Sequence, residues 1–231
     1  MLDFHVHLLP KVDDGPATAE SSRELLRCLA EQGVREAVAT PHRFSTRVPV
    51  ADGAVERAWT ATREIAAECG ISLHLGAENH FNGVIQPERF ASETVTLGGT
   101  TCTLVELPDD HLPVSTWSAC FALQAARRRP VLAHPERCKG LNRSDPQLAE
   151  FVAGGGLLQL TAGHLSGKHG WAMRWRSRRL LSRFPQACVI ASDGHDTKAR
   201  RPAFDLLPAA YRAWICPSLA ALQNWHGPQT A

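Results

Sequence analysis

The placement of polar residues at the ends of short apolar runs constrains this fold more than any other feature. Seven such runs, rich in Val, Leu, Ile and Ala, alternate with longer amphipathic stretches. They lack strict apolar–polar alternation, as is typical of strands buried on both faces. The expected strands are Leu2–His5, Glu36–Thr40, Ser72–Gly76, Cys102–Glu106, Pro130–Ala133, Leu157–Leu160 and Cys188–Ala191.

The amphipathic stretches predict helices. In Thr18–Gln32 a Thr stands at the start, leucines recur at helical spacing, and Gly33 follows the end. The others are Val55–Glu68, Ser115–Arg128, Asp145–Ala153 and Arg174–Phe184. Strands alternating with helices predict parallel βα units. Without a break in composition, we expect one α/β domain over residues 1–231, a closed or nearly closed TIM-like (β/α)7 barrel.

Composition excludes several classes of protein. The chain has 231 residues, 44% of them hydrophobic, which is enough for a substantial core. With 25 basic and 23 acidic residues, the charge gives no reason to expect a nucleic-acid partner. The seven scattered cysteines form no C-x-x-C pair and predict free thiols in a reducing compartment. No apolar stretch reaches the ~18 residues of a membrane span, so we expect a cytoplasmic protein without membrane insertion.

Six of the seven expected strands end in a His, Asp or Glu. In a barrel these ends converge on one face, where active sites lie. Chance accounts for one or two such residues, but six indicate a shared site. The ends are His5-Val6-His7, Thr40-Pro41-His42, Gly76-Ala77-Glu78, Glu106-Leu107-Pro108, His134-Pro135-Glu136-Arg137 and Ser192-Asp193-Gly194-His195.

The spacing of these residues favours metal binding. His5 and His7 point to the same side of an extended strand and can bind one ion. An isolated H-x-H pair is more often a pair of surface histidines, but the other strand ends favour a shared metal site. Asp13-Asp14-Gly15 alone would be a turn; here one of its carboxylates becomes a candidate ligand. The candidate ligands are His5, His7, Asp14, His42, Glu78, Glu106, His134, Asp193 and His195.

A ligand set of nitrogen and oxygen without sulfur suits Mn, Fe or Zn. Nine ligands are too many for one ion, which predicts two or three ions that share carboxylates. The four carboxylates balance the charge of two divalent ions, whereas a third would leave positive charge for a phosphate dianion. Arginines are the alternative source of that charge. Arg137 and Arg200 are the stronger candidates for phosphate binding, and Arg43 is equally well explained as a solvated loop residue.

The cysteines and one basic segment bear on other possible functions. A cysteine-based tyrosine phosphatase needs C-x5-R, and no Arg stands six residues after any cysteine. The segment Trp171–Arg179 mixes basic and aromatic residues. An exposed helix with Arg stems covering apolar surface is favoured there over nucleic-acid or membrane binding, with docking of an acidic peptide as a further alternative.

At these residues the chain resembles the PHP (polymerase and histidinol phosphatase) superfamily. Within it, the chain is similar to the CpsB/CapC-type metal-dependent bacterial tyrosine-protein phosphatases of capsule and exopolysaccharide operons. The motifs appear in the family's order over nearly the whole chain. They are Asp3-Phe4-His5-Val6-His7-Leu8-Leu9-Pro10, Val12-Asp13-Asp14-Gly15, Ala39-Thr40-Pro41-His42, Gly76-Ala77-Glu78, Glu106-Leu107-Pro108, Ala133-His134-Pro135-Glu136-Arg137, Gln159-Leu160-Thr161-Ala162-Gly163 and Ala191-Ser192-Asp193-Gly194-His195.

The resemblance implies a distorted seven-stranded barrel with a manganese-dependent, trinuclear site. It assigns the ligands of one ion as His5, His7, Glu78 and Asp193, those of a second as Glu78, Glu106 and His134, and those of a third as Asp14, His42 and His195. Arg137 and Arg200 match the family's phosphate-contacting arginines. The implied substrate is the phosphorylated tyrosine-rich tail of a bacterial autokinase that controls polysaccharide export.

The chain also departs from the family pattern. Asp196 replaces a common Asn, Cys216-Pro217 replaces a common Asn-Pro, and the stretch from Arg43 to Asp52 does not match. These departures leave the substrate open. The alternatives are a histidinol-phosphate or other small-molecule phosphatase, a proofreading exonuclease, and a non-catalytic metal- or nucleic-acid-binding module.

Overall fold

The strands form two parallel sheets. The computed structural model describes residues 1–141 and 145–228. Within those ranges it contains β1 (Leu2–Val6), β2 (Glu36–Ala39), β3 (His42–Arg43), β4 (Ser72–Leu75), β5 (Glu78–His80), β6 (Cys102–Glu106), β7 (Arg129–Ala133), β8 (Leu157–Thr161) and β9 (Cys188–Ala191). One sheet has the order β1-β2-β4 and the other β3-β5-β6-β7-β8-β9. All seven expected strands are found, and the parallel α/β class is confirmed.

The two additional strands, β3 and β5, each follow an expected strand after a two-residue break. Pro41 stands in the first break, where it has no N–H to donate to a ladder. Across the breaks, Gly76 N donates to Ala39 O at 2.9 Å and Glu78 N donates to Pro41 O at 3.1 Å. The structure therefore has nine short strands in two sheets where the sequence predicted seven in one.

Hydrogen bonds also link β1, the first strand, to the segment after β9, the last strand. Asp193 N, just after β9, donates to His5 O in β1 at 2.9 Å, and His7 N donates to Gly194 O at 2.9 Å. Buried Asp3 reinforces this junction, because Ser192 N donates to its Oδ1 at 3.0 Å. The carboxyl ends of β1 and β9 are therefore held side by side.

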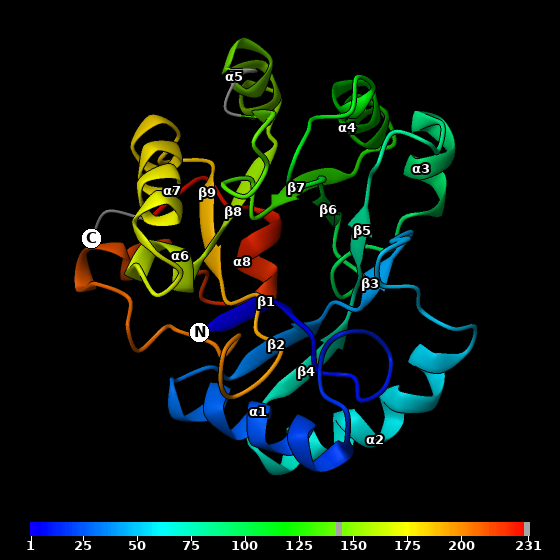
Figure 1. The fold of residues 1–231 in the computed structure, drawn as a ribbon, viewed down its shortest axis with the longest axis vertical. Helices are drawn as coiled ribbons and strands as arrows, with labels where there is room; N and C mark the ends of the chain where they lie inside the picture. The colour runs from blue at the N-terminus through cyan, green and yellow to red at the C-terminus, as the bar shows by residue number, and fades with distance from the viewer. Residues whose placement is uncertain (142–144, 229–231) are drawn as a thin grey trace.

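Helices cover the outer faces of the sheets. Figure 1 shows α1 and α2 beside the three-stranded sheet and α3, α4, α5 and α7 around the larger one. They are α1 (Ala19–Glu31), α2 (Ala54–Glu68), α3 (Pro87–Glu93), α4 (Thr116–Ala125), α5 (Asp145–Ala153), α6 (Ala162–Ser166), α7 (Trp171–Arg183), α8 (Leu219–Gln223) and the 3-10 helix η2 (Ala209–Trp214). The five expected helices are confirmed, whereas α3, α6 and α8 have too few turns to show a periodic pattern. Within the described ranges, no helix is both long and apolar enough to cross a membrane.

Three local features agree with the sequence analysis. Thr18 caps α1 with a reciprocal pair of hydrogen bonds to Ser21, which satisfies backbone donors at the helix start. None of the seven cysteines, all of which lie within the described ranges, forms a disulfide. On α7, the side chains of Trp171 and Trp175 are 82% and 56% exposed, as expected for an exposed helix.

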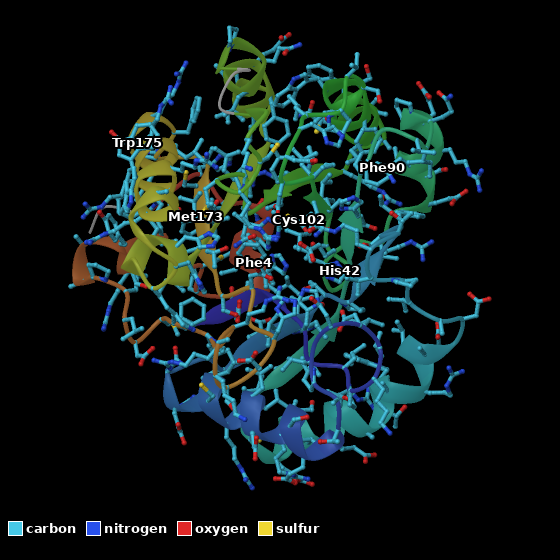
Figure 2. The ribbon with its side chains drawn as sticks, viewed as in Figure 1. Phe4, His42, Phe90, Cys102, Met173 and Trp175 are labelled. Atoms are coloured by element: carbon cyan, nitrogen blue, oxygen red, sulfur yellow. The ribbon has the colours of Figure 1, made fainter. Side chains whose placement is uncertain are left out.

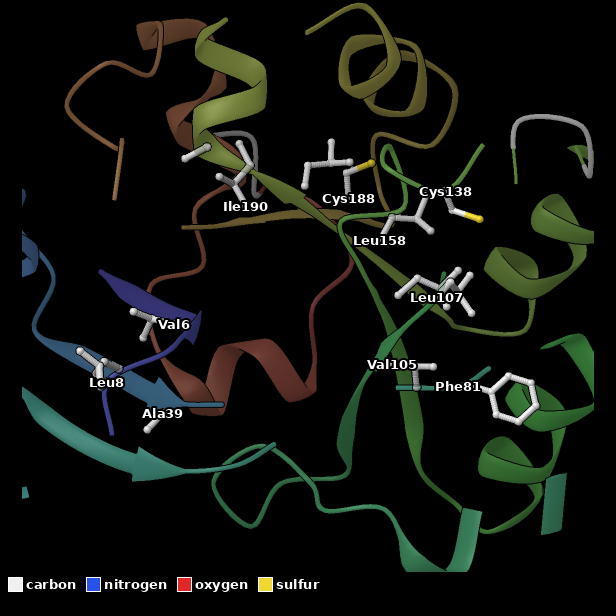
Figure 3. Packing of buried hydrophobic residues seen from close by; sticks show 14 of the residues in the cluster. Val6, Leu8, Ala39, Phe81, Val105, Leu107, Cys138, Leu158, Cys188 and Ile190 are labelled. Atoms are coloured by element: carbon white, nitrogen blue, oxygen red, sulfur yellow. The ribbon is translucent and has the colours of Figure 1, made fainter. Parts of the chain in front are cut away.

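The apolar core has two parts. The larger one lies between strands and outer helices, and Figure 3 shows members such as Leu8, Phe81 and Ile190. The smaller one, the inner core, gathers side chains of the strands, such as Phe4 of β1, and it includes Leu219 and Leu222 of α8. The C-terminal segment thus completes the inner core and leaves the carboxyl ends of the strands free for function.

The role of α8 can be tested by truncating one of its buried side chains. Leu222 is 0% exposed, so we expect Leu222→Ala to lower the free energy of unfolding by about 2–5 kcal/mol, measured by urea denaturation. Leu206 is 48% exposed and provides the control. Leu206→Ala should change the free energy by no more than about 0.5 kcal/mol. Similar losses in both variants would contradict the role of α8 in the inner core.

Candidate metal centre

All nine predicted ligands converge at the carboxyl ends of the strands. They come from β1 and the segment after it, from β3, β5 and β6, and from the segments after β7 and β9. Their ligand atoms form four overlapping groups, within each of which the atoms lie no more than 4.8 Å apart. The groups are His7/Asp14/His42/His195, His5/His7/Asp193, His5/Glu78/His134 and His42/Glu78/Glu106.

Two of these residues have an unusual backbone conformation. His134 has φ of 30° and Asp193 has φ of 51°, in the left-handed region that residues with a Cβ seldom adopt. Gln159 Oε1 accepts from His134 N at 2.9 Å, and this contact holds the backbone in place. Strained backbone persists only where its surroundings enforce it, and it gathers at functional sites. The strain here orients two candidate ligands toward the centre.

Glu78 lies at the middle of the cluster and is 1% exposed. Its Oε1 is 2.9 Å from His134 Nε2 and 3.3 Å from His5 Nε2. Its Oε2 is 3.0 Å from His42 Nδ1 and 3.4 Å from His7 Nε2. One carboxylate therefore faces four imidazoles, two on each oxygen, which is the geometry of a bridging ligand.

Asp14 organises the other side of the cluster. Its Oδ1 is 3.2 Å from Nε2 of both His42 and His195. The sequence named Asp14 as the candidate ligand from the segment Asp13-Asp14-Gly15, and the structure separates the roles of the two carboxylates. Asp13 Oδ2 instead contacts His7 Nδ1 at 2.7 Å and accepts from His42 N at 3.2 Å. Asp13 thus orients His7 and His42 through contacts outside the four groups of candidate ligands.

Several supporting residues were not found from the sequence. Gln159 Oε1 contacts His5 Nδ1 at 2.9 Å, which leaves Nε2 for the cluster, as such partners do around metal-binding histidines. The available signal was the position of Gln159 between Leu158 and Leu160 in the buried strand β8. His80 Nδ1 lies 2.8 Å from Glu106 Oε2. It stands two residues after Glu78 on β5, the same spacing as His5 and His7.

The polar atoms at the centre lack hydrogen bonds. Nε2 of His5, His7 and His195 and Nδ1 of His42 are buried without a hydrogen-bond partner. Buried polar atoms are otherwise nearly always paired, and each exception needs an explanation. Carboxylate oxygens face these nitrogens, and a divalent ion with bonds of about 2.0–2.2 Å to each would satisfy both sets. The donor set therefore fits nitrogen- and oxygen-bound divalent metals.

The charges in the cluster shift the pKa values of its members. Burial alone would lower the pKa of His42, but the carboxylates of Asp14 and Glu78 raise it to about 11. Burial opposes the shift in His7 too, where Asp13 and Glu78 raise the pKa to about 10. Burial would raise the pKa of Glu78, yet His5, His134 and His42 hold it well below its usual range. Without a metal, protons on the imidazoles therefore balance the carboxylates.

The candidate arginines separate into two groups. Arg137 binds Asp109 through two hydrogen bonds of 3.1 Å, and its Nη1 lies 3.6 Å from Asp193 Oδ2. Arg200 Nη1 donates to Asp14 Oδ2 at 2.6 Å. Both therefore lie against the cluster.

Arg43 does not. Its side chain donates to Glu93 O at 3.1 Å and lies over the Phe44 ring. The predicted role of Arg43 in substrate binding is therefore not supported by its position, since the short strand β3 directs His42 inward and its neighbour outward. Arg47, in the stretch that departs from the family pattern, lines the cavity instead.

A cavity of about 510 Å³ lies over the cluster. Asp14, His42, Glu78, Glu106, His134 and Asp193 line its floor, and Arg137 and Arg200 line its wall. Figure 2 shows His42 at the middle of the molecule, near the junction of the two sheets. The cavity thus places two guanidinium groups beside a cluster suited to divalent cations.

The fold resembles that of phosphotriesterase-like hydrolases. The phosphotriesterase homology protein from Escherichia coli, solved with phosphate in its active site, aligns with a TM-score of 0.54 at 11% identity, over 84% of this chain and 82% of that one. At this identity the likeness concerns the fold alone. The chain therefore has a mixed α/β fold with parallel sheets, similar to that of TIM-barrel-type proteins, and candidate metal ligands gather at its strand ends.

The particular family is defined by closer relatives. The model for capsular polysaccharide synthesis, CpsB/CapC, matches residues 1–210, and the chain belongs to this family. The tyrosine-protein phosphatase YwqE from Bacillus subtilis is 31% identical over 87% of this chain and 79% of that protein. The tyrosine-protein phosphatase CpsB from Streptococcus pneumoniae is 29% identical over 92% of each chain. The family assignment made from the sequence is therefore confirmed.

A solved structure supports the same assignment. Crystal structures of YwqE and of the pneumococcal CpsB are described as those of unique metal-dependent tyrosine phosphatases. The match has a TM-score of 0.78 at 30% identity, and it covers 89% of this chain and 84% of the other.

The raised pKa values predict that metal binding releases protons. His7 and His42, with pKa values of about 10 and 11, are protonated at pH 7, and a divalent ion must displace these protons. We therefore expect the affinity for Mn²⁺ to rise between about pH 6 and 8. Calorimetric titration of metal-free protein in two buffers of different ionisation enthalpy measures the protons released. A binding enthalpy that is independent of the buffer would contradict this prediction.

Proposed function

We propose that this chain is a metal-dependent protein-tyrosine phosphatase that hydrolyses phosphotyrosine on a protein substrate. The observation that carries the proposal is the single cavity that joins the nine-residue cluster to Arg137 and Arg200. The names of the curated relatives, tyrosine-protein phosphatases in Bacillus and Streptococcus, support the same activity. No cysteine is involved, because the cluster consists of imidazoles and carboxylates.

The proposal includes three divalent ions, with Mn²⁺ as the metal and Fe or Zn as alternatives. His5, His7, Glu78 and Asp193 would hold the first ion, Glu78, Glu106 and His134 the second, and Asp14, His42 and His195 the third. The overlapping groups around Glu78 support this sharing of ligands. When bound, such ions would activate a water nucleophile and offset charge on the phosphoryl oxygens.

The chain's own residues bind and orient the phosphate. Arg137 and Arg200 would contact the non-bridging oxygens, because guanidinium groups match phosphate with two parallel hydrogen bonds. Both already lie against the carboxylates of the cluster. Charge that develops on these oxygens during hydrolysis would meet donors that are already in place.

The proposal extends to architecture and context. We interpret the two sheets as one distorted barrel, since counting β2 with β3 and β4 with β5 gives seven strands and Val6 bridges Gly194 beyond β9. The whole chain would form one domain and act in the cytoplasm. Its partner would be the phosphotyrosine tail of a bacterial tyrosine autokinase that regulates capsule or exopolysaccharide synthesis, in line with the family description.

Metal removal tests the function directly. Dialysis against a chelator should abolish release of phosphate from a phosphotyrosine peptide, and Mn²⁺ should restore it, because the cluster lacks another source of activated water. Histidinol phosphate and single-stranded DNA, offered to the same preparation, represent the alternative functions. Preferential hydrolysis of either one would contradict the proposal.

A comparison of two arginines tests phosphate binding. Arg137 and Arg43 each follow a candidate histidine ligand, but only Arg137 lines the cavity. We expect Arg137→Lys to reduce kcat/KM on a phosphotyrosine peptide by about 10²-fold, since one preorganised donor is commonly worth that much. Arg43→Lys should change it less than about twofold. Equal losses would assign the effect to general disturbance of the strand ends.

A further inference from the structure

A second carboxylate–histidine pair lies beside the metal cluster. His164 Nδ1 and Glu136 Oε1 are 2.7 Å apart. Glu136 is fully buried, and the same oxygen accepts from Thr161 N at 2.9 Å. Its other oxygen, Oε2, is buried without a hydrogen bond. The carboxylate is therefore enclosed, and the His164 side chain contacts it directly.

This pair faces the same cavity as the cluster. His164 lines it together with Asp193 and Arg137, although His164 belongs to none of the four candidate ligand groups among the described residues. Its side chain is 10% exposed. Because Nδ1 contacts Glu136, Nε2 is the ring nitrogen left for a molecule in the cavity.

Neighbouring residues hold the His164 ring in place. The His169 ring packs edge-on against it, with centroids 5.2 Å apart and an interplanar angle of 81°. Gly163 permits this packing, because a Cβ there would lie 2.8 Å from His169 Nε2. Met173 from α7 also lines this wall, and Figure 2 shows it on the inner side of the helix. The imidazole is thus held by Glu136 and packed against His169, and it lines the cavity.

We propose that His164 donates a proton to the leaving phenolic oxygen and that Glu136 is the positioning residue that orients it. This rests on the proposed phosphatase function. The phosphorus–oxygen bond to the tyrosine breaks, its electron pair passes to the phenolic oxygen, and that oxygen takes the proton from His164 Nε2. Water supplies the new oxygen on phosphorus and loses one proton to solvent, from which His164 regains its own.

The basicity of the leaving phenolic oxygen explains why this proton transfer would increase the rate. The pKa of the tyrosine hydroxyl is about 10, so departure as a free anion is costly near neutral pH. A positioned proton donor contributes typically about 10²–10⁴-fold to such a step. The Glu136 carboxylate fixes the orientation of the His164 ring, as carboxylates do for catalytic histidines elsewhere.

The test compares leaving groups in one variant. His164→Asn keeps an amide donor for Glu136 but removes the ring nitrogen that would hold the proton. Its kcat on a phosphotyrosine peptide should fall about 10²-fold or more, while kcat on p-nitrophenyl phosphate, whose anion leaves readily, should fall less than about threefold. Glu136→Gln, a second and independent variant, should show the same selectivity for the poor leaving group.

A matched pair elsewhere provides the control. His74 Nε2 lies 3.0 Å from Glu36 Oε1, and both residues are outside the cavity lining. His74→Gln should leave kcat on both substrates unchanged. Equal losses on both substrates in His164→Asn, at unchanged metal content, would assign His164 a structural role and overturn the inference. Activity on neither substrate in the wild-type enzyme would overturn the proposed function and the inference with it.

Discussion

The contact on which the site depends is the one between buried Glu78 and four imidazoles. Each oxygen of this carboxylate lies within 3.4 Å of two histidine nitrogens. Removing a carboxylate from water is costly unless opposite charge compensates it. The cluster supplies that compensation either as protons on the imidazoles or as metal ions. Four strands must therefore meet around one side chain, and this requirement fixes their relative positions.

The interrupted strands explain how Glu78 reaches that position. Glu78 pairs with His42 of β3 on one side and with Leu104 of β6 on the other. This register exists because the chain leaves the three-stranded sheet after Leu75 and joins the larger sheet at Glu78. An uninterrupted β4 would have continued beside β2 in the smaller sheet. The break that the sequence did not reveal is thus what brings the central ligand to the other ligands.

The sequence predicted which side chains converge, because the carboxyl ends of parallel strands come together whatever the exact geometry of the sheets is. It named Asp14 as the candidate ligand, but it gave no role to Asp13, whose contact with His7 depends on the path of one loop. It also missed Gln159, whose role follows from its distance to His5 across two strands that are far apart in sequence. The position of Arg43 has a related explanation. Adjacent residues on a strand point to opposite faces, so its proximity to His42 in the chain does not bring its side chain to the cavity.

Two carboxylates divide their oxygens between the cluster and the arginines. Asp14 directs Oδ1 to His42 and His195 and Oδ2 to Arg200. Asp193 directs Oδ1 to His5 at 3.4 Å and Oδ2 to Arg137 at 3.6 Å. A short, rigid carboxylate thus sets the separation between each guanidinium and the cluster. Long arginine side chains lose considerable rotamer freedom when they are ordered, and here much of that ordering precedes any ligand. The same residues that would hold cations also position the two guanidinium groups, so a compact α/β fold brings candidate cation-binding and anion-binding groups to one cavity.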